Sequence, residues 1–256
     1  MNLEEVLTLY DLEQRREPED PAMRREVIGP VVRLVSRHDR RSCVIYSSLS
    51  TENVEAAISE QIEYFNALGH GFEWKVFSHD TPADLKERLV ARGFALDETE
   101  AILALDLQEL PAALAGLPRH DVRRVTNASG LCDLMAVHQA VWGDDTMGLE
   151  ERLARELRDQ PDRTSCYVAY VDGVAAGAAR LNVDPNSRFA SLWGGSTVPA
   201  FRKQGLFTSL VAARAQEARR RGARFLTVDA RPMSRPILER LGFKVLTFAN
   251  ALNWRM

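Results

Sequence analysis

The chain has 256 residues, a formal net charge of −3 and 45% apolar residues. This length accommodates one large domain or two small ones, and the apolar content suffices for ordinary hydrophobic cores. The acidic balance gives no general attraction to nucleic acid, and no apolar run reaches the about 18 residues of a membrane span. We therefore expect a soluble protein with neither a nucleic-acid nor a membrane partner.

Two further features bear on where the protein works. The N-terminus MNLEEVLTLYDLEQRREPED is acidic and lacks the basic start and apolar centre of a secretory signal, which predicts a cytoplasmic location. The cysteines Cys43, Cys132 and Cys166 lie far apart and show no CxxC spacing. They indicate buried thiols rather than a disulfide framework or a zinc site, so we expect no metal.

The first part of the chain alternates helices and strands. The expected elements are an N-terminal helix, a hairpin of Val31 to Val35 and Cys43 to Tyr46, a helix from Asn53 to about Leu68, a strand Phe72 to Phe77, a helix with Thr81 as N-cap and Pro82 at its first position, and a strand Ala101 to Leu105. The stretch QELPAALAGLPRH, which contains prolines and a glycine, then predicts a linker near residues 108 to 120.

The second part contains more strands. The expected elements are a strand Val122 to Val125, helices Leu131 to Trp142 and Leu149 to Asp159, a hairpin of Cys166 to Val171 and Val174 to Asn182, a strand Phe189 to Val198, a helix 205 to 221, a strand Arg224 to Val228, a helix Ser234 to Leu241, and a closing strand to Trp254. The pair Asp172-Gly173 is the strongest short-range hairpin signal in the chain.

The turn Arg202-Lys203-Gln204-Gly205 is the most informative segment, because it leads from an apolar strand directly into an amphipathic helix. The first N–H groups of a helix lack intrahelical partners and, with the helix dipole, favour a phosphate. Gly205 allows close approach, and Arg202 and Lys203 add positive charge. Although any helix can begin with glycine and basic residues, the flanking strand and the apolar helix face favour a diphosphate site.

A basic cluster lies near the end of the same helix. Its members are Arg214, Arg219, Arg220, Arg221 and Arg224. Cations suit the C-terminal end of a helix, so we interpret this cluster as a solvated helix end rather than as a nucleic-acid patch.

An internal repeat relates the two parts of the chain. In each part a helix, a glycine, a strand, a short helix, a Gly-Phe pair and a strand follow in order. In each part a leucine, Leu89 or Leu238, stands four residues before the glycine of the Gly-Phe pair. The segment YSSLSTENVEAA, ahead of the first copy's helix, has neither glycine nor a basic pair. The first copy is therefore not expected to hold a diphosphate.

These features together resemble the GNAT superfamily of acyl-CoA-dependent N-acyltransferases. Residues 120 to 254 cover its pattern, including the Arg-x-x-Gly-x-Gly/Ala turn, in which Phe207 replaces the last small residue. The resemblance implies an α/β fold of the α+β type, with a mixed, mostly antiparallel sheet flanked by helices. It divides the chain into a degenerate GNAT-like domain over residues 1–107 and a GNAT N-acetyltransferase domain over residues 120–256, similar to tandem members of the mycothiol-synthase type.

The resemblance also implies acetyl-CoA as co-substrate. In the family, the strand before the turn splays away from its parallel neighbour, here Phe225 to Val228, and pantetheine pairs with the exposed edge. The implied contacts are the backbone of Thr197 and Val198, the Val198 N–H also serving the thioester oxygen. The diphosphate would meet the turn and the helix start, at Arg202, Lys203, Gln204, Gly205, Leu206, Phe207 and Thr208.

The implied reaction is direct attack of a primary amine on the acetyl thioester. Family members often carry a tyrosine acid where this chain has Leu238, and a glutamate base in the strand that here offers Gly194, Gly195 and Ser196. The catalytic candidate that remains is Asp229, which could equally bond Arg231 or cap the next helix.

More remote candidates for the catalytic group are His138 and Asp144, each of which also has an ordinary structural explanation. His138 suits a packed core, and Asp144 suits a helix cap or a solvent-facing position.

Three functions remain open. The first is an N-acetyltransferase acting on a small-molecule or peptide amine. The second is a non-catalytic acyl-CoA sensor, consistent with the missing tyrosine and glutamate. The third is an aminoacyl-tRNA-dependent transferase, which the net acidity disfavours. The sequence specifies neither the acceptor nor the oligomeric state.

Overall fold

The protein is described by a computed structural model that covers residues 1–37, 41–143 and 148–256. Asp144, one of the catalytic candidates, lies outside these residues. The chain forms two compact units: residues 1–103, 230–236 and 245–256 make the first, and residues 104–229 and 237–244 make the second. Four elements contain a point where the chain passes from one unit to the other, namely β6 (Glu100–Asp106), β11 (Phe225–Ala230), α8 (Arg235–Arg240) and β12 (Lys244–Trp254).

The first unit is built on a sheet of the order β1-β2-β3-β4-β12, with β5 paired to β12. Its remaining elements are α1 (Leu3–Tyr10), η1 (Asp11–Arg16), β1 (Met23–Ile28), β2 (Val31–Ser36), β3 (Ser42–Ser47), α2 (Val54–Ala67), β4 (Phe72–Phe77), α3 (Leu85–Ala91) and β5 (Ala95–Leu96). The strands β1, β2 and β3 are antiparallel neighbours, β3 and β4 are parallel, and β12 runs antiparallel to β4.

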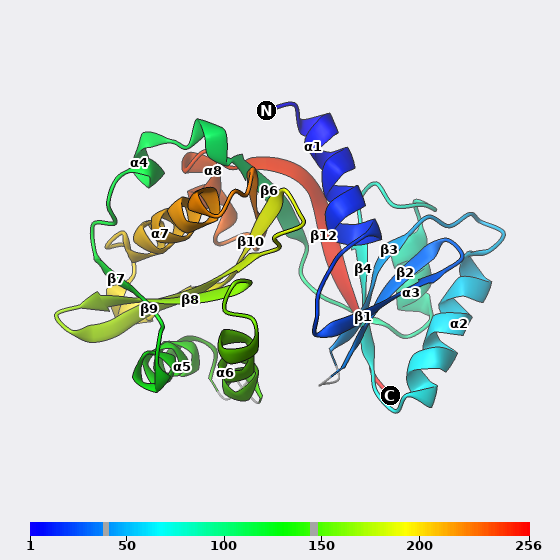
Figure 1. Ribbon diagram of the computed structural model, residues 1–256. Helices are drawn as coiled ribbons and strands as arrows, with labels where there is room; N and C mark the ends of the chain where they lie inside the picture. The colour runs from blue at the N-terminus through cyan, green and yellow to red at the C-terminus, as the bar shows by residue number, and fades with distance from the viewer. Residues whose placement is uncertain (38–40, 144–147) are drawn as a thin grey trace. The chain divides into compact units, whose positions relative to one another are not determined.

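The core of the first unit lies between its sheet and the helices α2 and α3 (Figure 1). Trp74 of β4, Phe65 of α2 and Leu89 of α3 are fully buried there. The rings of Phe65 and Phe72 stack with centroids 4.2 Å apart. Alternation along β4 sends Phe77 to the other face, where Tyr10 of α1 meets it at 6.2 Å between ring centroids.

A buried arginine holds the start of the chain to the end of β4. Arg15 of η1 is 0% exposed. Its guanidinium donates to Asp80 at 2.6 and 2.8 Å and to Asp11 at 2.7 Å, and it lies 3.7 Å from the centroid of the Phe77 ring. The carboxylates of Asp11 and Asp80 compensate the buried charge of Arg15, so this guanidinium needs no partner from outside the first unit.

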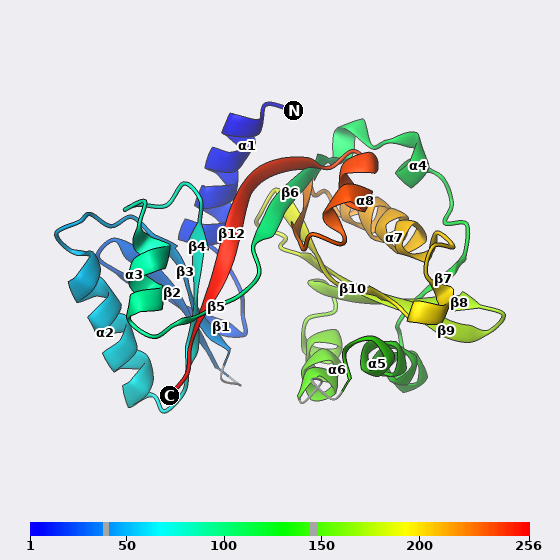
Figure 2. The same cartoon turned by 180° about the vertical axis from the view of Figure 1, so that it is seen from behind.

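The second unit has the strand order β7-β8-β9-β10-β11, in which only β10 and β11 are parallel. Its further elements are η2 (Leu107–Glu109), α4 (Ala112–Ala115), β7 (Asp121–Arg124), α5 (Ala128–Trp142), α6 (Leu149–Asp159), β8 (Thr164–Val171), β9 (Val174–Val183), β10 (Phe189–Thr197), η3 (Pro199–Phe201) and α7 (Leu206–Arg220). Helices α5 and α6 cover one face of this sheet and α7 covers the other, as Figures 1 and 2 show from opposite sides.

The predicted fold class is confirmed: the chain forms mixed, mostly antiparallel strands flanked by helices. The hairpin at Asp172-Gly173 is also confirmed, since Val171 pairs with Val174 and both turn residues have positive φ. No helix in the described ranges is long and apolar enough to cross a membrane.

The structure differs from the sequence prediction at the start of α3 and in the burial of Cys132. The helix expected to begin at Thr81 and Pro82 begins at Leu85. The carbonyl of Thr81 accepts the Leu49 N–H at 3.2 Å, so it does not serve as the first helical acceptor. Cys132, expected to be buried, is exposed on α5, because it lies beside the inward-facing Leu131 rather than on the apolar face.

Both units contain the same local topology. In each, antiparallel strands lead to one parallel pair, and a helix connects the two parallel strands: α2 between β3 and β4, and α7 between β10 and β11. This shared order is what the internal repeat in the sequence predicts.

The core of the first unit provides a test of stability on two neighbouring residues of α3. Leu89 is 0% exposed and Val90 is 44% exposed. We expect Leu89→Ala to lower the free energy of unfolding by about 2–5 kcal/mol, because it leaves a cavity in the core. Val90→Ala should change it by less than about 0.5 kcal/mol. Urea unfolding followed by tryptophan fluorescence, to which Trp74 of this core contributes, measures both effects. Equal effects of the two substitutions would contradict this description of the core.

Candidate functional site

A tight turn joins β10 to α7 in the second unit. After η3, the backbone is left-handed at Lys203, with φ of 64°, and at Gly205, with φ of 92°. Turns of this kind direct successive N–H groups toward one concave side. Glycine adopts a left-handed backbone at no steric cost, which is the physical reason for glycine at position 205.

The start of α7 leaves backbone donors unused inside the helix. Its N-cap is Gly205, which makes no side-chain capping bond. The intrahelical bonds begin with the Ser209 N–H, which donates to the Gly205 carbonyl at 3.0 Å. The N–H groups of Leu206, Phe207 and Thr208 therefore have no acceptor within the helix. Together with the positive end of the helix dipole, they make this end of α7 suited to an anion, and we call it the anion-binding turn.

Side chains reinforce this turn. Arg202 and Lys203 are exposed, and Arg202 Nε donates to the Thr197 carbonyl at 3.2 Å, which fixes the turn to the end of β10. His120, a residue that the sequence analysis did not identify, approaches from the segment before β7. Its Nδ1 lies 3.0 Å from Ser209 Oγ, and a Cβ at position 205 would lie 3.5 Å from its ring.

The parallel pair of the sheet opens next to this turn. Residues Phe189 to Leu192 of β10 pair with Phe225 to Val228 of β11, and the pairing ends there. Strand β10 nevertheless continues along β9 to Thr197, with an irregularity between Trp193 and Ser196. From Trp193 onward, one edge of β10 is thus left without β11, which is the splay that the resemblance implies.

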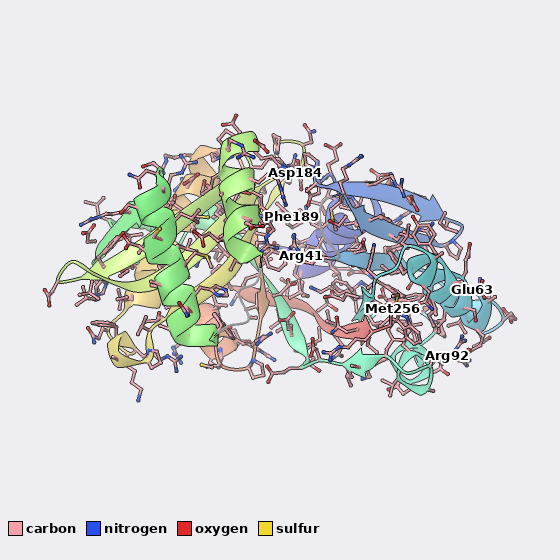
Figure 3. The ribbon with its side chains drawn as sticks, turned by 90° about the horizontal axis from the view of Figure 1, so that it is seen from below. Arg41, Glu63, Arg92, Asp184, Phe189 and Met256 are labelled. Atoms are coloured by element: carbon pink, nitrogen blue, oxygen red, sulfur yellow. The ribbon has the colours of Figure 1, made fainter. Side chains whose placement is uncertain are left out.

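We call this opening the fork, and apolar packing holds the end of the paired stretch that lies away from it. Phe189, labelled in Figure 3, is 1% exposed, and its ring centroid lies 5.3 Å from that of Phe225 on the paired strand. The paired end is therefore fixed by side chains as well as by backbone hydrogen bonds. Only the far end of β10, toward the turn, offers unused backbone groups.

The directions of these backbone groups correct one expectation. The Val198 N–H donates to the Ala176 carbonyl at 2.9 Å, and the Val198 carbonyl accepts the Phe201 N–H at 2.9 Å. Val198 therefore has no backbone group for a thioester oxygen. Because backbone groups alternate along a strand, those of Thr197 point to the opposite side, toward the open edge.

The predicted catalytic residue lies at the mouth of the fork. Asp229 is half-buried and directly follows Val228, the last residue of β11 that pairs with β10. Leu238 of α8 is 0% exposed and fills core. His138 lies on α5 with its ring 6.3 Å from that of Trp142. Across the three described ranges, no group of three His, Cys, Asp or Glu side chains could hold a metal ion.

A buried network anchors α7 to the sheet. Ser165 Oγ of β8 donates to Glu217 Oε1 at 2.6 Å, the Tyr167 hydroxyl donates to the other carboxylate oxygen, and Arg221 Nη1 donates to Oε1 at 3.1 Å. Burial acts to raise the pKa of Glu217, but the bonds from Ser165 and Tyr167 and the charge of Arg124 outweigh it and hold the pKa below its usual value. Glu217 is thus an ionised anchor.

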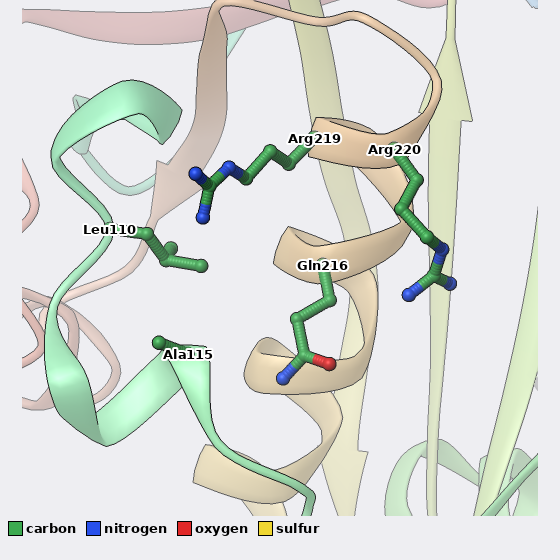
Figure 4. A pocket seen from close by; sticks show the side chains of 5 residues that line it. All are labelled: Leu110, Ala115, Gln216, Arg219 and Arg220. Atoms are coloured by element: carbon green, nitrogen blue, oxygen red, sulfur yellow. The ribbon is translucent and has the colours of Figure 1, made fainter.

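A hollow of about 350 Å³ lies at the opposite end of α7 (Figure 4). It is lined by Leu110, Ala115, Gln216, Arg219 and Arg220. Gln216 lies ten residues after Leu206, or about 15 Å along the helix axis. This hollow is therefore separate from the anion-binding turn, and the Gln216 amide there donates to the Leu114 and Gly116 carbonyls at 2.8 and 2.6 Å.

A forked parallel strand pair that leads into an uncapped helix start places an open strand edge beside helix N–H groups that lack acceptors. Residues 133–243 match the family described as acetyltransferase (GNAT) family. The match spans less than half of the chain and lies in the second unit except for residues 230–236, and it confirms the resemblance seen in the sequence for this part of the chain. No curated protein sequence matches the chain.

Solved structures support the same fold over the whole chain. A GCN5-related N-acetyltransferase from Kribbella flavida is 19% identical, with a TM-score of 0.71 over 98% of this chain and 95% of that one. A conserved protein of unknown function from Staphylococcus epidermidis is 14% identical, with a TM-score of 0.68 over 91% and 94%. A tandem GNAT protein from the clavulanic acid biosynthesis pathway is 14% identical, with a TM-score of 0.61 over 100% and 88%.

The anchor of α7 provides a pH test. A carboxylate whose pKa is lowered by folding stabilises the protein above its unfolded value, here 4.5, and that stability is lost as pH falls through the folded pKa. We expect Glu217→Gln to cost about 1–3 kcal/mol at pH 7. The difference from wild type should shrink as pH falls below 4.5.

Urea unfolding at a series of pH values measures this difference. The control is Asp162→Asn at an exposed loop carboxylate. A difference between wild type and Glu217→Gln that stays constant with pH would show that the carboxylate is not the anchor.

Proposed function

We propose that the second unit is an N-acetyltransferase that transfers the acetyl group of acetyl-CoA to a primary amine of a small molecule or peptide. The observation that carries this proposal is the continuity of the open β10 edge with the anion-binding turn at the start of α7. The edge suits an extended pantetheine arm and the turn suits a diphosphate, and these are two consecutive parts of coenzyme A. The GNAT match of residues 133–243 supports the same ligand.

The residues have separate roles in this proposal. The backbone N–H groups from Lys203 and Gln204 through Gly205, Leu206, Phe207 and Thr208 bind the diphosphate, and the side chains of Arg202 and Lys203 add charge. Thr197 pairs with pantetheine through its backbone N–H on the open edge, since its carbonyl already accepts a hydrogen bond from Arg202 Nε. Val198 supports the end of the strand through its partly buried side chain, which packs against the cluster around Val137 and Leu153.

The chemistry follows from this placement. The lone pair of a neutral amine nitrogen attacks the acyl carbon, and the C–S bond breaks with its electron pair on sulfur. Asp229 at the mouth of the fork accepts the proton that the ammonium form must lose. Positioning of the amine and the thioester supplies most of the rate enhancement.

A second candidate is an acyl-CoA sensor without turnover. The fully buried Leu238 favours it, because the position that supplies a proton donor in the resemblance holds a leucine. The two candidates differ in one observable, the release of free CoA when an amine is added.

We further propose that the chain consists of a degenerate GNAT-like copy over residues 1–107 and an N-acetyltransferase domain over residues 120–256. The shared order of strands and crossover helix supports the repeat. Among the described residues of the first copy between β3 and α2, none has a positive φ, and α2 begins after Asn53 rather than after a glycine. This copy therefore lacks the turn that would hold a diphosphate.

The diphosphate site is tested by two substitutions at one position. Gly205→Asn and Gly205→Asp are nearly equal in shape, and both residues tolerate a left-handed backbone better than other side chains. We expect Gly205→Asp to weaken acetyl-CoA binding at least about tenfold more than Gly205→Asn, because its carboxylate repels the diphosphate. Calorimetric titration with acetyl-CoA measures both. Equal affinities would place the diphosphate elsewhere.

Turnover is tested separately. An amine library is incubated with the protein and acetyl-CoA, and free thiol is measured. Release that depends on one class of amine supports the transferase, and it should fall with Asp229→Asn. Tight acetyl-CoA binding without release by any amine would favour the sensor.

A further inference from the structure

Arg214, in the middle of α7, is buried against the sheet. The sequence places it in a solvated basic cluster, and that interpretation is wrong for this residue, which is 1% exposed. The reason is helical spacing: Arg214 lies four residues from both Leu210 and Ala218, which are buried on the sheet-facing side of α7. Burial of an arginine without compensation is costly, so its surroundings are informative.

No carboxylate compensates the Arg214 guanidinium in the described part of the chain. Its Nε donates to the Leu210 carbonyl at 2.9 Å and its Nη1 donates to the Arg180 carbonyl at 3.0 Å. Its Nη2 donates to no atom of the described residues. The nearest carboxylate on the same helix, Glu217, is already engaged by Ser165, Tyr167 and Arg221.

Arg214 remains a cation despite its burial. Burial lowers its pKa to about 9, while the groups that act on it are Tyr167 of β8, which raises the pKa, and Arg180 of β9, which lowers it. A value of about 9 still leaves the guanidinium protonated at neutral pH. The second unit therefore holds one full positive charge in its interior.

This charge reaches the open edge of β10. A Cβ at Gly195 would lie 3.6 Å from Arg214 Nη2 and 3.2 Å from the Phe207 ring. Gly195 is itself exposed and belongs to the irregular stretch that β11 leaves unpaired. The missing side chain at position 195 is what brings the guanidinium close to the edge.

One hydroxyl group on the same face of the sheet also lacks a partner. Side chains alternate along a strand, so Thr197 lies on the same face as Gly195, and its buried Oγ1 has no hydrogen-bond partner among the described residues. Buried hydroxyl groups are normally satisfied. The unsatisfied Thr197 hydroxyl is an observation independent of Arg214, and it indicates a polar ligand at this edge.

Arg214 is too far along α7 to serve the diphosphate. It lies eight residues after Leu206, or about 12 Å along the helix axis. A coenzyme A molecule with its diphosphate at the turn places its sulfur at the other end of the pantetheine arm, farther along β10. Gly195 and Arg214 lie in that direction.

We propose that Arg214 stabilises the negative charge of the departing coenzyme A sulfur and so replaces the proton donor that Leu238 cannot provide. The inference rests on the proposed function. In this step the amine forms the C–N bond, the C–S bond breaks, the electron pair stays on sulfur as a thiolate, and the amine proton passes through Asp229 to water. The thiolate is paired electrostatically with the guanidinium until coenzyme A leaves.

The test measures the ionisation of the thiol of bound coenzyme A, which needs no acceptor amine. Coenzyme A is titrated with base on wild type, Arg214→Met and Arg214→Lys, and thiolate is followed by its ultraviolet absorbance. The same titration with desulfo-coenzyme A is subtracted, because it removes the signals of Tyr167 and of the protein's own thiols. Calorimetry with coenzyme A confirms that each variant binds.

We expect the thiol pKa on wild type to lie at least about one unit below that of free coenzyme A. Arg214→Lys, which keeps the charge, should retain most of this shift, and Arg214→Met should abolish it. A role limited to bonding the two carbonyls predicts no shift in any of these proteins. If Arg214→Met does not fold, Gly195→Ala provides a second variant, because its methyl group lies 3.6 Å from Nη2 and should reduce the shift.

The outcomes separate this inference from the proposed function. Coenzyme A that binds wild type without a shifted thiol pKa overturns the role of Arg214 alone. An unchanged shift in Arg214→Met also overturns it and assigns the shift to other groups. Failure of coenzyme A to bind wild type overturns the proposed function and this inference with it.

Discussion

The second unit depends on one feature of backbone pairing: β10 has a partner on both edges for only part of its length. From Ala190 to Leu192 it is held by β9 and β11, and beyond Leu192 by β9 alone. Unpaired backbone groups in a sheet must be solvated or satisfied by a ligand. The opening starts after Leu192 and Val228, the last paired residues, and the bulge before Ser196 affects how the remaining strand faces it.

Helix α7 places hydrogen-bond donors and charged side chains next to this opening. Its first turn presents free N–H groups, and its middle carries Arg214 and Glu217, which bind the sheet from the same face. These two buried ions lie three residues apart and act differently. Glu217 is ionised, its charge is compensated by its neighbours and it anchors the helix, whereas Arg214 keeps an unpaired charge near the edge. The same helix therefore contributes support and electrostatics to one site.

The sequence predicts much of this arrangement, and the exceptions have physical causes. Strand β4 and helix α6 have the predicted bounds, because apolar alternation and helical spacing are local signals. Strand β1 is not predicted from the sequence, since half of its residues, MRREVI, are charged and it lies at an edge of the sheet. The hydrogen bonds of the Val198 backbone depend on the strand register and on a bulge. The contact of His120 with Ser209 joins residues 89 positions apart in the sequence. Neither is encoded locally. The burial of Arg214 was missed because charge was given more weight than helical position.

The anchoring of α7 has a consequence for how a ligand is received. The turn, with its left-handed backbone at Lys203 and Gly205, takes its shape when the chain folds. Its conformational entropy is therefore lost on folding and not on ligand binding. A preorganised receptor of this kind needs no rearrangement before capture, so its association rate is governed by diffusion and charge steering.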